Sequence, residues 1–270
     1  MTVQPTAFSK SIDSYLNYTR MPWGKLFYST AWDQLNGQMD QQITPMDPND
    51  TRTSPSILDI GCGFGLSSIE YAARGYRVTG IEPTYEMLEV AKQSAQECGL
   101  AINFLLTRLQ EVDHNDLCGP YNWVFCHNIL EYVDDAESII HTISRQQQSG
   151  GFLSIIAHNP IAKVMKKVII NKDPEEALHS IGNPKEYSHV IQTDIVTYTL
   201  EQLIDLLHSS GYELVERYGI HNTYGYIADN ECKQNEAWHD KATALELRLS
   251  RMSPYRDIAM FTHLIARKRG

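Results

Sequence analysis

Several features that would assign this chain to a class of protein are missing from its sequence. No apolar run approaches the length of a membrane span, so we expect no membrane segment. The stretch from Met1 to Asp13 contains no basic segment followed by an apolar one, which argues against a secretory signal. No internal repeat is visible, so a solenoid or propeller is not expected.

Paired cysteines, clustered histidines and excess positive charge are absent as well. The five cysteines form no C-x-x-C pair and the ten histidines show no ligand spacing. We therefore expect reduced thiols in a cytoplasmic protein and no metal site. The 33 acidic residues outnumber the 23 Lys and Arg, for a formal net charge of −10. This balance argues against a broad nucleic-acid-binding surface but is compatible with a local basic face.

The chain is organised around the stretch of residues 56–82. A short apolar strand ends at Asp59, and Gly61, Gly63 and Gly65 follow at alternate positions. A helical pattern comes next, and a second strand ends at Glu82. This order of strand, glycine turn, helix, and strand with a terminal acid is typical of a βαβ unit that binds a ribose-containing ligand.

The glycine spacing separates three classes of ligand. A dinucleotide motif requires G-x-G-x-x-G, but Leu66 stands where a glycine spaced for that motif would be. A phosphate loop requires Gly-Lys-Ser/Thr, and no lysine occurs in this turn. The remaining pattern, Asp-x-Gly-x-Gly-x-Gly, resembles motif I of class I S-adenosylmethionine methyltransferases. Asp59 suits the cationic amino-acid tail of that ligand, and Glu82 can accept hydrogen bonds from its ribose.

The rest of the chain continues the alternation of strands and helices, which predicts a mostly parallel sheet that binds its ligand beyond the carboxyl ends of the strands. We predict an α/β fold: a Rossmann-like, seven-stranded class I methyltransferase sheet with helices on both faces. A single domain, 1–270, would comprise a helical lid and linker (1–55), a cofactor-binding core (56–157), an insertion after strand five (158–198), and C-terminal helices and last strands (199–270). Further strands are expected at 102–106, 121–126, 152–157, 212–220 and 257–267.

Two segments outside the core carry specific expectations. Residues 8–37 read as two helices broken near Pro22, which form a lid over the ligand or cover a sheet edge, and a turn-rich loop follows from Thr44 to Pro55. In the insertion, an amphipathic helix with Lys163, Lys166 and Lys167 is either an ordinary solvated face or a contact for an anionic substrate. Residues 173–198 read as irregular.

Four further segments of the sequence resemble one particular family of methyltransferases. Trp23-Gly24-Lys25-Leu26, His127-Asn128-Ile129-Leu130-Glu131-Tyr132-Val133, Leu245-Glu246-Leu247 and Pro254-Tyr255 together resemble the tRNA wobble carboxymethoxyuridine methyltransferases. Those enzymes esterify the carboxylate of a modified base in the tRNA anticodon loop. The resemblance implies the methyl donor S-adenosylmethionine, the product S-adenosylhomocysteine, and a tRNA partner.

Cofactor contacts follow from the motif and from the resemblance together. His127 is a candidate base, but its place at the end of strand four favours cofactor contact. The predicted cofactor-binding residues are Asp59, Gly61, Cys62, Gly63, Glu82, Pro83, Met87, Leu109, Gln110 and His127.

The methyl acceptor is less constrained by the sequence. A family arginine that reaches the cofactor from the N-terminal helices aligns with Phe27 here, and a family arginine after the sixth strand aligns with His221. The family's lysine-rich stretch is replaced by 183–187. A carboxylate acceptor needs cations or donors rather than a base. The candidate substrate-binding residues are Tyr18, Arg20, His221 and Arg256, with Lys25 as a further cation. No catalytic residue is assigned.

Three functions remain open at this point. The first is a tRNA carboxyl methyltransferase, and the second is a small-molecule O-methyltransferase of the same fold acting on a carboxylate or a phenol. The third is a binding module that senses the nucleoside without turnover.

Overall fold

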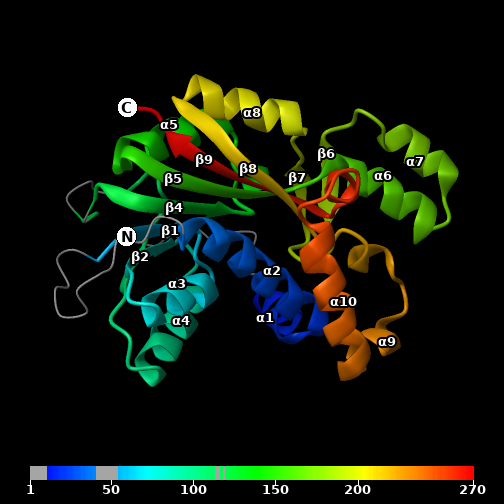
Figure 1. Ribbon diagram of the computed structural model, residues 1–270, viewed down its shortest axis with the longest axis horizontal. Helices are drawn as coiled ribbons and strands as arrows, with labels where there is room; N and C mark the ends of the chain where they lie inside the picture. The colour runs from blue at the N-terminus through cyan, green and yellow to red at the C-terminus, as the bar shows by residue number, and fades with distance from the viewer. Residues whose placement is uncertain (1–10, 41–53, 113–115, 118) are drawn as a thin grey trace.

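The computed structural model describes residues 11–40, 54–112, 116–117 and 119–270, so Asp113, Cys118 and most of the Thr44–Pro55 loop lie outside the described residues. Its centre is a seven-stranded sheet of order β3-β2-β1-β4-β5-β9-β8 (Figure 1). The first five strands of this order run parallel, and β9 runs antiparallel to both of its neighbours. The predicted fold class is thereby confirmed. The strands are β1 (Ser56–Ile60), β2 (Arg77–Glu82), β3 (Asn103–Leu106), β4 (Tyr121–His127), β5 (Gln147–His158), β8 (Tyr212–Ile220) and β9 (Phe261–Lys268).

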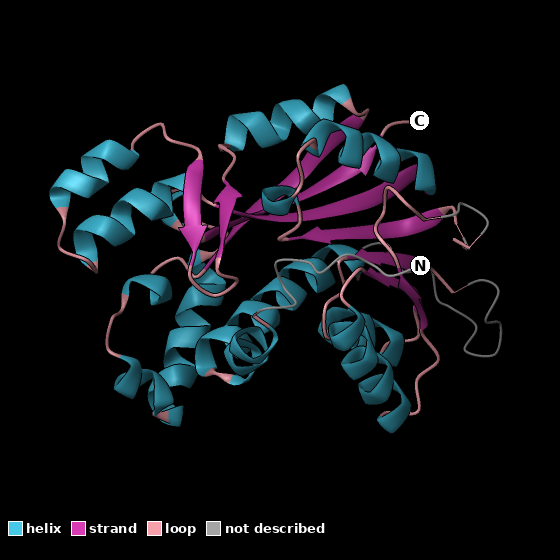
Figure 2. Ribbon diagram, turned by 180° about the vertical axis from the view of Figure 1, so that it is seen from behind, coloured by secondary structure: helices cyan, strands magenta, loops and turns pink. Residues whose placement is uncertain are grey.

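Helices cover both faces of the sheet, as Figures 1 and 2 show. One face packs against α5 (Ala136–Gln146) and α8 (Leu200–Ser209), and the other against α2 (Pro22–Met39) and α3 (Leu66–Ala73). Side chains alternate along β1, with Leu58 in the first core cluster and Ile57 in the second. All five residues of β1 are therefore buried, as in a parallel strand covered on both sides.

The N-terminal helices are α1 (Ile12–Arg20) and α2, and the break at Met21 lies where Pro22 predicts it. Pro22 occupies the first turn of α2, where its missing N–H removes no helical bond. The two helices cross closely, since a Cβ on Gly24 would lie 2.1 Å from the carbonyl oxygen of Tyr18.

The insertion is more regular than the sequence predicted. After α6 (Pro160–Ile169) come α7 (Pro174–Ser180) and an antiparallel hairpin of β6 (Lys185–Ser188) and β7 (Thr193–Val196), so the expectation of an irregular segment was wrong. Asp173 caps α7 by accepting from the N–H of Glu176, and an aspartate at this position is a sequence signal for the start of a helix. The hairpin alternates polar and apolar residues over only four positions per strand, too few for a clear period.

The C-terminal part agrees with the prediction more closely. Thr199 and Gln202 form the predicted capping box at the start of α8, and β8 covers 212–220 as expected. The last strand begins at Phe261, four residues later than predicted, because 255–258 form a short 3₁₀ helix. The remaining helices are α4 (Tyr85–Glu97), α9 (Asn230–Gln234) and α10 (Glu236–Leu249). Within the described part of the chain, no helix combines the length and apolarity needed to cross a bilayer.

Candidate active site

The glycine turn after β1 forms one wall of a cavity of about 510 Å³. Gly61 and Gly63 both have positive φ angles, 62° and 56°, which a residue with a Cβ adopts only at a cost. A Cβ on Gly63 would meet nothing nearer than Tyr15 Cε1 at 3.8 Å, so this backbone faces open space in the cavity. A Cβ on Gly61 would lie 2.2 Å from Ile129 Cδ1. The turn therefore presents bare backbone to a ligand.

Glu82 lies beside this turn, at the end of β2, and also lines the cavity. Its Oε2 accepts from the N–H of Gly63 at 3.0 Å and its Oε1 from the N–H of Thr84 at 2.8 Å. Burial raises the pKa of the carboxyl, and hydrogen bonds from the Thr84 side chain and from the two backbone N–H groups act in the opposite direction. An ionised carboxylate has about four acceptor positions, so Glu82 keeps acceptor capacity for a ribose hydroxyl.

Asp59 and Cys62 lie behind the turn, and neither belongs to the residues that line the cavity. Asp59 is buried, and its Oδ2 accepts from Ser68 Oγ at 2.7 Å, which ties β1 to α3. Burial raises the pKa of Asp59 to about 7, and the bond from Ser68 acts against this rise. Asp59 therefore supports the turn, and its contact with the ligand tail stays a prediction.

The other predicted cofactor residues come together in the cavity. Pro83 and Met87 continue from Glu82, and Leu109 and Gln110 follow β3. Met87 and Leu109 are buried and provide apolar contacts, whereas Gln110 is exposed at the rim. Bare glycine backbone, a carboxylate with free lone pairs and an apolar pocket fit the amino acid, ribose and adenine of S-adenosylmethionine. Contact by each of these residues remains a prediction.

One part of the cavity wall is aromatic and is built from segments far apart in the sequence. Tyr15 stacks on Phe64 with ring centroids 5.5 Å apart, and its hydroxyl lies 3.0 Å from that of Tyr28. The helices α1 and α2 thus line the cavity, which supports the lid prediction. Ser11 Oγ, at the start of α1, donates to the carbonyl of Ile191 in the insertion at 2.7 Å. This side of the cavity is lined by Tyr15, Tyr18, Phe27, Tyr28, His127, Tyr132, His158, Ser188, Val190, Ile191 and Phe261.

Charge on the cavity wall is mostly negative or absent. Among the residues that the structure describes, Arg108 is the one Lys or Arg in the lining, and it follows β3 on the side of the predicted adenine pocket. Burial lowers the pKa of His127 to about 3 and, together with nearby Lys166, that of His158 to about 4. Both imidazoles are therefore neutral at pH 7, and the aromatic side of the cavity carries no cation from the described residues.

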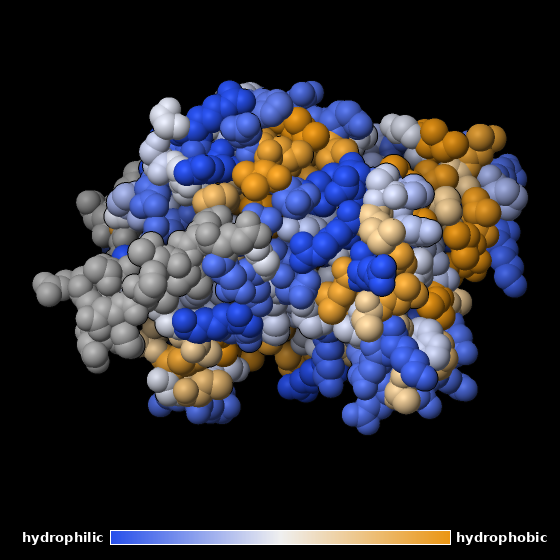
Figure 3. Space-filling model, in the orientation of Figure 1, coloured by the Kyte–Doolittle hydropathy of each residue, from blue (hydrophilic) through white to orange (hydrophobic). Residues whose placement is uncertain are grey.

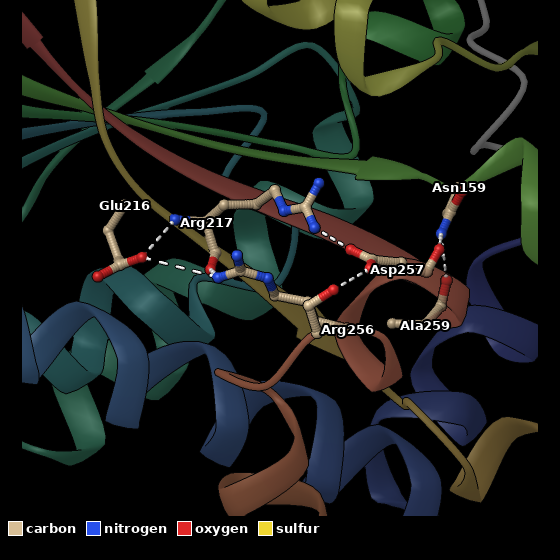
Figure 4. Close-up of polar contacts among 7 residues, drawn as sticks. Asn159, Glu216, Arg217, Arg256, Asp257 and Ala259 are labelled. Carbon is tan, nitrogen blue, oxygen red and sulfur yellow. Dashed lines mark hydrogen bonds and ion pairs between the residues drawn. The ribbon is translucent and has the colours of Figure 1, made fainter.

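The predicted substrate residues separate in the structure. Tyr18 lines the cavity, whereas Arg20 is exposed on α1 outside the lining. Arg256 donates through Nη1 to the carbonyl of Arg217 at 3.0 Å and lies 3.9 Å from Glu216, among the polar contacts of Figure 4. These contacts fix Arg256 against β8, away from the cavity.

His221 is buried one layer behind the cavity wall. Its ring packs edge-on against Phe27 and Phe261, with centroids 6.3 Å and 6.1 Å apart. The two positions where the resemblance implies arginines are therefore in contact with each other, and both are aromatic here. Burial lowers the pKa of His221 to about 4, so this ring is neutral too.

The lysines of α6 do not form the basic face that the sequence suggested. Lys163 is buried, and its Nζ donates to the carbonyls of Asn183 and Lys185 at 2.5 Å and 2.8 Å. Lys167 pairs with Glu176 of α7. The exposed side of α6 carries Lys166 and also Ile161 and Val168, which are nearly half exposed. Hydrophobic residues gather at the right of Figure 3, where Figure 1 shows α6 and α7.

Sequence reasoning missed most of the aromatic wall. Tyr15 and Phe261 occupy apolar positions of a helix and a strand, and such a pattern does not tell which apolar face borders a cavity. His158 follows β5, the neighbour of β4 in the sheet. Because the carboxyl ends of parallel strands share one edge, its place could have signalled that it joins His127.

Known proteins that are similar to this chain are methyltransferases. Residues 58–155 match the family model described as methyltransferase domain. The tRNA 5-carboxymethoxyuridine methyltransferase of Escherichia coli is 26% identical over 248 residues, which covers 91% of this chain and 89% of that protein. The ubiquinone biosynthesis O-methyltransferase of Haemophilus ducreyi is 29% identical over 180 residues, 64% of this chain and 76% of that protein.

Solved structures agree on the fold. A putative S-adenosylmethionine dependent methyltransferase from Listeria monocytogenes superposes with a TM-score of 0.57 at 17% identity, over 90% of this chain and 98% of that one. The magnesium protoporphyrin IX methyltransferase of Synechocystis, with bound S-adenosylmethionine, superposes with a TM-score of 0.50 at 14% identity, over 99% of this chain and 86% of that one.

Proposed function

We propose that this chain, a class I S-adenosylmethionine-dependent methyltransferase, transfers the methyl group to a hydroxyl oxygen of an uncharged, flat, mostly apolar small molecule. The observation that carries this proposal is the contact between Phe27 and His221. Where the resemblance implies two arginines, one of which reaches the cofactor, this chain has an aromatic residue and a neutral imidazole, so neither position offers a cation to an anionic acceptor.

S-adenosylmethionine supplies a methyl group on a positively charged sulfur, so the electrophile needs no activation by the protein. The protein contributes alignment of the two reactants and exclusion of water. Glu82 and the turn at Gly61 and Gly63 would hold the donor. The aromatic wall would hold the acceptor by stacking, since flat rings pair favourably with aromatic side chains.

The wall favours a neutral acceptor over a carboxylate. A buried carboxylate requires a cation or several donors, since burying an uncompensated charge is costly. His127 and His158 are uncharged at neutral pH because burial lowers their pKa values. A neutral imidazole can accept a hydrogen bond from a hydroxyl, whereas it provides at most one N–H to an anion.

A second candidate is methylation of the carboxylate of carboxymethoxyuridine in tRNA. The alignment over 91% of the chain with the tRNA enzyme of E. coli favours it. In that case Arg20, on the exposed side of α1, would contact the RNA backbone, and the splayed base would stack in the aromatic wall.

Both candidates can be tested in one assay with labelled S-adenosylmethionine. The acceptors are 2-naphthol and 2-naphthoate, which share a ring system and differ in the reacting group, and tRNA that bears carboxymethoxyuridine. We expect methylation of 2-naphthol at least ~10-fold faster than that of 2-naphthoate, the scale of one favourable hydrogen bond against a mismatched one. Faster formation of a methyl ester on the tRNA than of the naphthyl ether would overturn the proposal in favour of the second candidate.

A further inference from the structure

A buried chain of four polar side chains runs across the sheet from the cavity to α2. His127 Nε2 lies 2.7 Å from Ser154 Oγ, which lies 2.8 Å from His263 Nε2. His263 Nδ1 lies 2.5 Å from Gln34 Oε1, and Gln34 Nε2 donates to the carbonyl of Gly219 at 3.0 Å. Ser154, His263 and Gln34 are fully buried. The strands β4, β5 and β9 each contribute one member.

The backbone carbonyl of Gly219 fixes the direction of every hydrogen bond in this chain. A carbonyl only accepts, so the amide nitrogen of Gln34 must face Gly219, and the amide oxygen of Gln34 must face His263. That oxygen only accepts, so His263 Nδ1 carries a proton. Burial and the neighbouring His127 keep the pKa of His263 well below its usual range, so His263 is neutral and its Nε2 is unprotonated.

The same reasoning continues to the cavity. Ser154 must donate its one proton to His263 Nε2, so its oxygen accepts from His127. His127 Nε2 therefore carries a proton. Because His127 is neutral, its Nδ1 has a free lone pair. His127 lines the cavity, and Nδ1 takes part in none of the hydrogen bonds found among the described residues.

We propose that Gln34, acting through His263 and Ser154, fixes the tautomer of His127 so that its Nδ1 accepts the hydroxyl proton of the methyl acceptor. This inference rests on the proposed function. Gln34, His263 and Ser154 are positioning residues, and His127 is the residue that touches the acceptor. An ionised carboxylate has no proton to donate, so its oxygen lone pairs would repel the lone pair of His127 Nδ1. This tautomer therefore also favours a hydroxyl acceptor over an anionic one.

The step balances in atoms and charge. As the acceptor oxygen bonds to the methyl carbon, the carbon–sulfur bond breaks and its electron pair stays on sulfur. The hydroxyl proton passes to His127 Nδ1, which becomes part of an imidazolium whose Nε2–H still donates to Ser154. One positive charge leaves sulfur as another appears on the ring, so the net charge of the cavity is unchanged. Release of that proton to solvent restores His127.

The tautomer can be read directly by ¹⁵N NMR of histidine-labelled full-length protein loaded with S-adenosylhomocysteine. We expect His127 with a protonated Nε2 and an unprotonated Nδ1, and we expect 2-naphthol to shift the Nδ1 resonance while 2-naphthoate does not. A protonated Nδ1 would overturn the proposal. The proposal would also be overturned if the Nδ1 resonance shifted on addition of S-adenosylhomocysteine but not on addition of saturating 2-naphthol. That result would show that His127 contacts the cofactor.

Variants of the relay test the role of Gln34 separately. Gln34→Leu removes the acceptor for His263 Nδ1, and we expect a mixture of His127 tautomers and at least a ~10-fold lower kcat on 2-naphthol, within the range for general-base contributions. The KM for S-adenosylmethionine should stay within about two-fold. Gln34→Glu keeps an acceptor at this position and should restore the tautomer. Gln38→Leu is the matched control, because Gln38 lies one turn further on α2 and donates to Tyr218 Oη outside the relay.

Ser154→Ala interrupts the relay at a second point, in case Gln34→Leu does not fold. A parental tautomer and parental kcat in whichever of these two variants folds would overturn the positioning role. If neither naphthalene compound is methylated, the proposed function fails, and the NMR tautomer of His127 and its response to these variants still decide the relay.

Discussion

At the scale of single residues, Glu82 connects the glycine turn to the ligand that it is predicted to hold. Its two oxygens accept from the backbone N–H groups of Gly63 and Thr84. Removing the carboxylate therefore removes ribose acceptors and loosens the turn.

We expect Glu82→Ala to weaken binding of S-adenosylhomocysteine by ~1.5–3 kcal/mol, the scale for hydrogen bonds to a charged group. Isothermal calorimetry measures the change. Glu89→Ala is the control, because Glu89 is a surface acid on α4 that pairs with Lys92. Equal affinity of the Glu82 variant and the parent for S-adenosylhomocysteine would show that Glu82 does not bind the ribose.

Asp59 makes the stability of the fold depend on pH. Burial raises the pKa of this carboxyl to about 7 in the folded chain. In the unfolded chain, Asp ionises near its ordinary pKa of ~3.9, so between these values the folded state holds the proton more tightly. The free energy of unfolding therefore falls as pH rises from about 4 to about 7, and changes no further above that range on account of Asp59.

Asp59→Asn should remove this dependence while keeping an acceptor for Ser68. Between pH 4 and pH 7 we expect the free energy of unfolding of the parent to fall by on the order of 2–4 kcal/mol more than that of the variant. This figure follows from ~1.4 kcal/mol per unit of pKa shift. Urea unfolding at several pH values measures it, with Glu137→Gln, a change on the exposed face of α5, as the control. Parallel pH profiles for parent and Asp59→Asn would contradict the raised pKa.

At the scale of elements, the glycine turn was the most predictable part of the chain, because its chemistry is local. Alternating glycines and a terminal acid are adjacent in sequence, and the backbone angles they allow depend on no distant contact. The same holds for the capping box of α8 at Thr199. The insertion was less predictable because its elements are short, and because Lys163 hydrogen-bonds to a segment twenty or more residues later.

Gly63→Val tests the turn. A valine there would require a φ angle of 56° and would place its side chain in the cavity, so we expect no measurable binding of S-adenosylhomocysteine by a folded protein. Gly75→Val is a matched control, since Gly75 has a φ of 89° with no atom near its missing Cβ. It should lower the melting temperature and leave binding intact. Cofactor binding by folded Gly63→Val would show that the ligand avoids this backbone.

Lys163→Met tests the insertion. The methionine keeps the length of the side chain but leaves the carbonyls of Asn183 and Lys185 without this donor. We expect a loss of ~1–3 kcal/mol of stability, the cost of unsatisfied buried polar groups. Lys166→Met, on the exposed side of the same helix, should change stability little. Equal chemical denaturation curves for both variants would mean that water replaces the lysine without loss.

At the scale of the whole molecule, the mostly parallel sheet and a ligand site beyond the carboxyl ends of its strands were predictions from the alternation of strands and helices; the sheet is confirmed, and a cavity lies at that edge. The acceptor side could not be predicted in this way, because its wall combines side chains from α1, α2, the ends of β4 and β5, the start of β9, and the insertion hairpin. No sequence period relates such distant segments. The relay from Gln34 to His127 is hidden for the same reason, since it crosses three strands that are neighbours only in the folded sheet.

The origin of the two cavity walls has an evolutionary consequence. The residues that we expect to hold the methyl donor follow strands of the core sheet, whereas much of the aromatic wall, where we place the acceptor, belongs to the N-terminal helices and to the hairpin of the insertion. Substitutions at Tyr18, Phe27 or Val190 during evolution can therefore change the preferred acceptor while the affinity for the methyl donor stays the same. A library randomised at these three positions should yield clones that divide by acceptor preference and share one dissociation constant for S-adenosylhomocysteine.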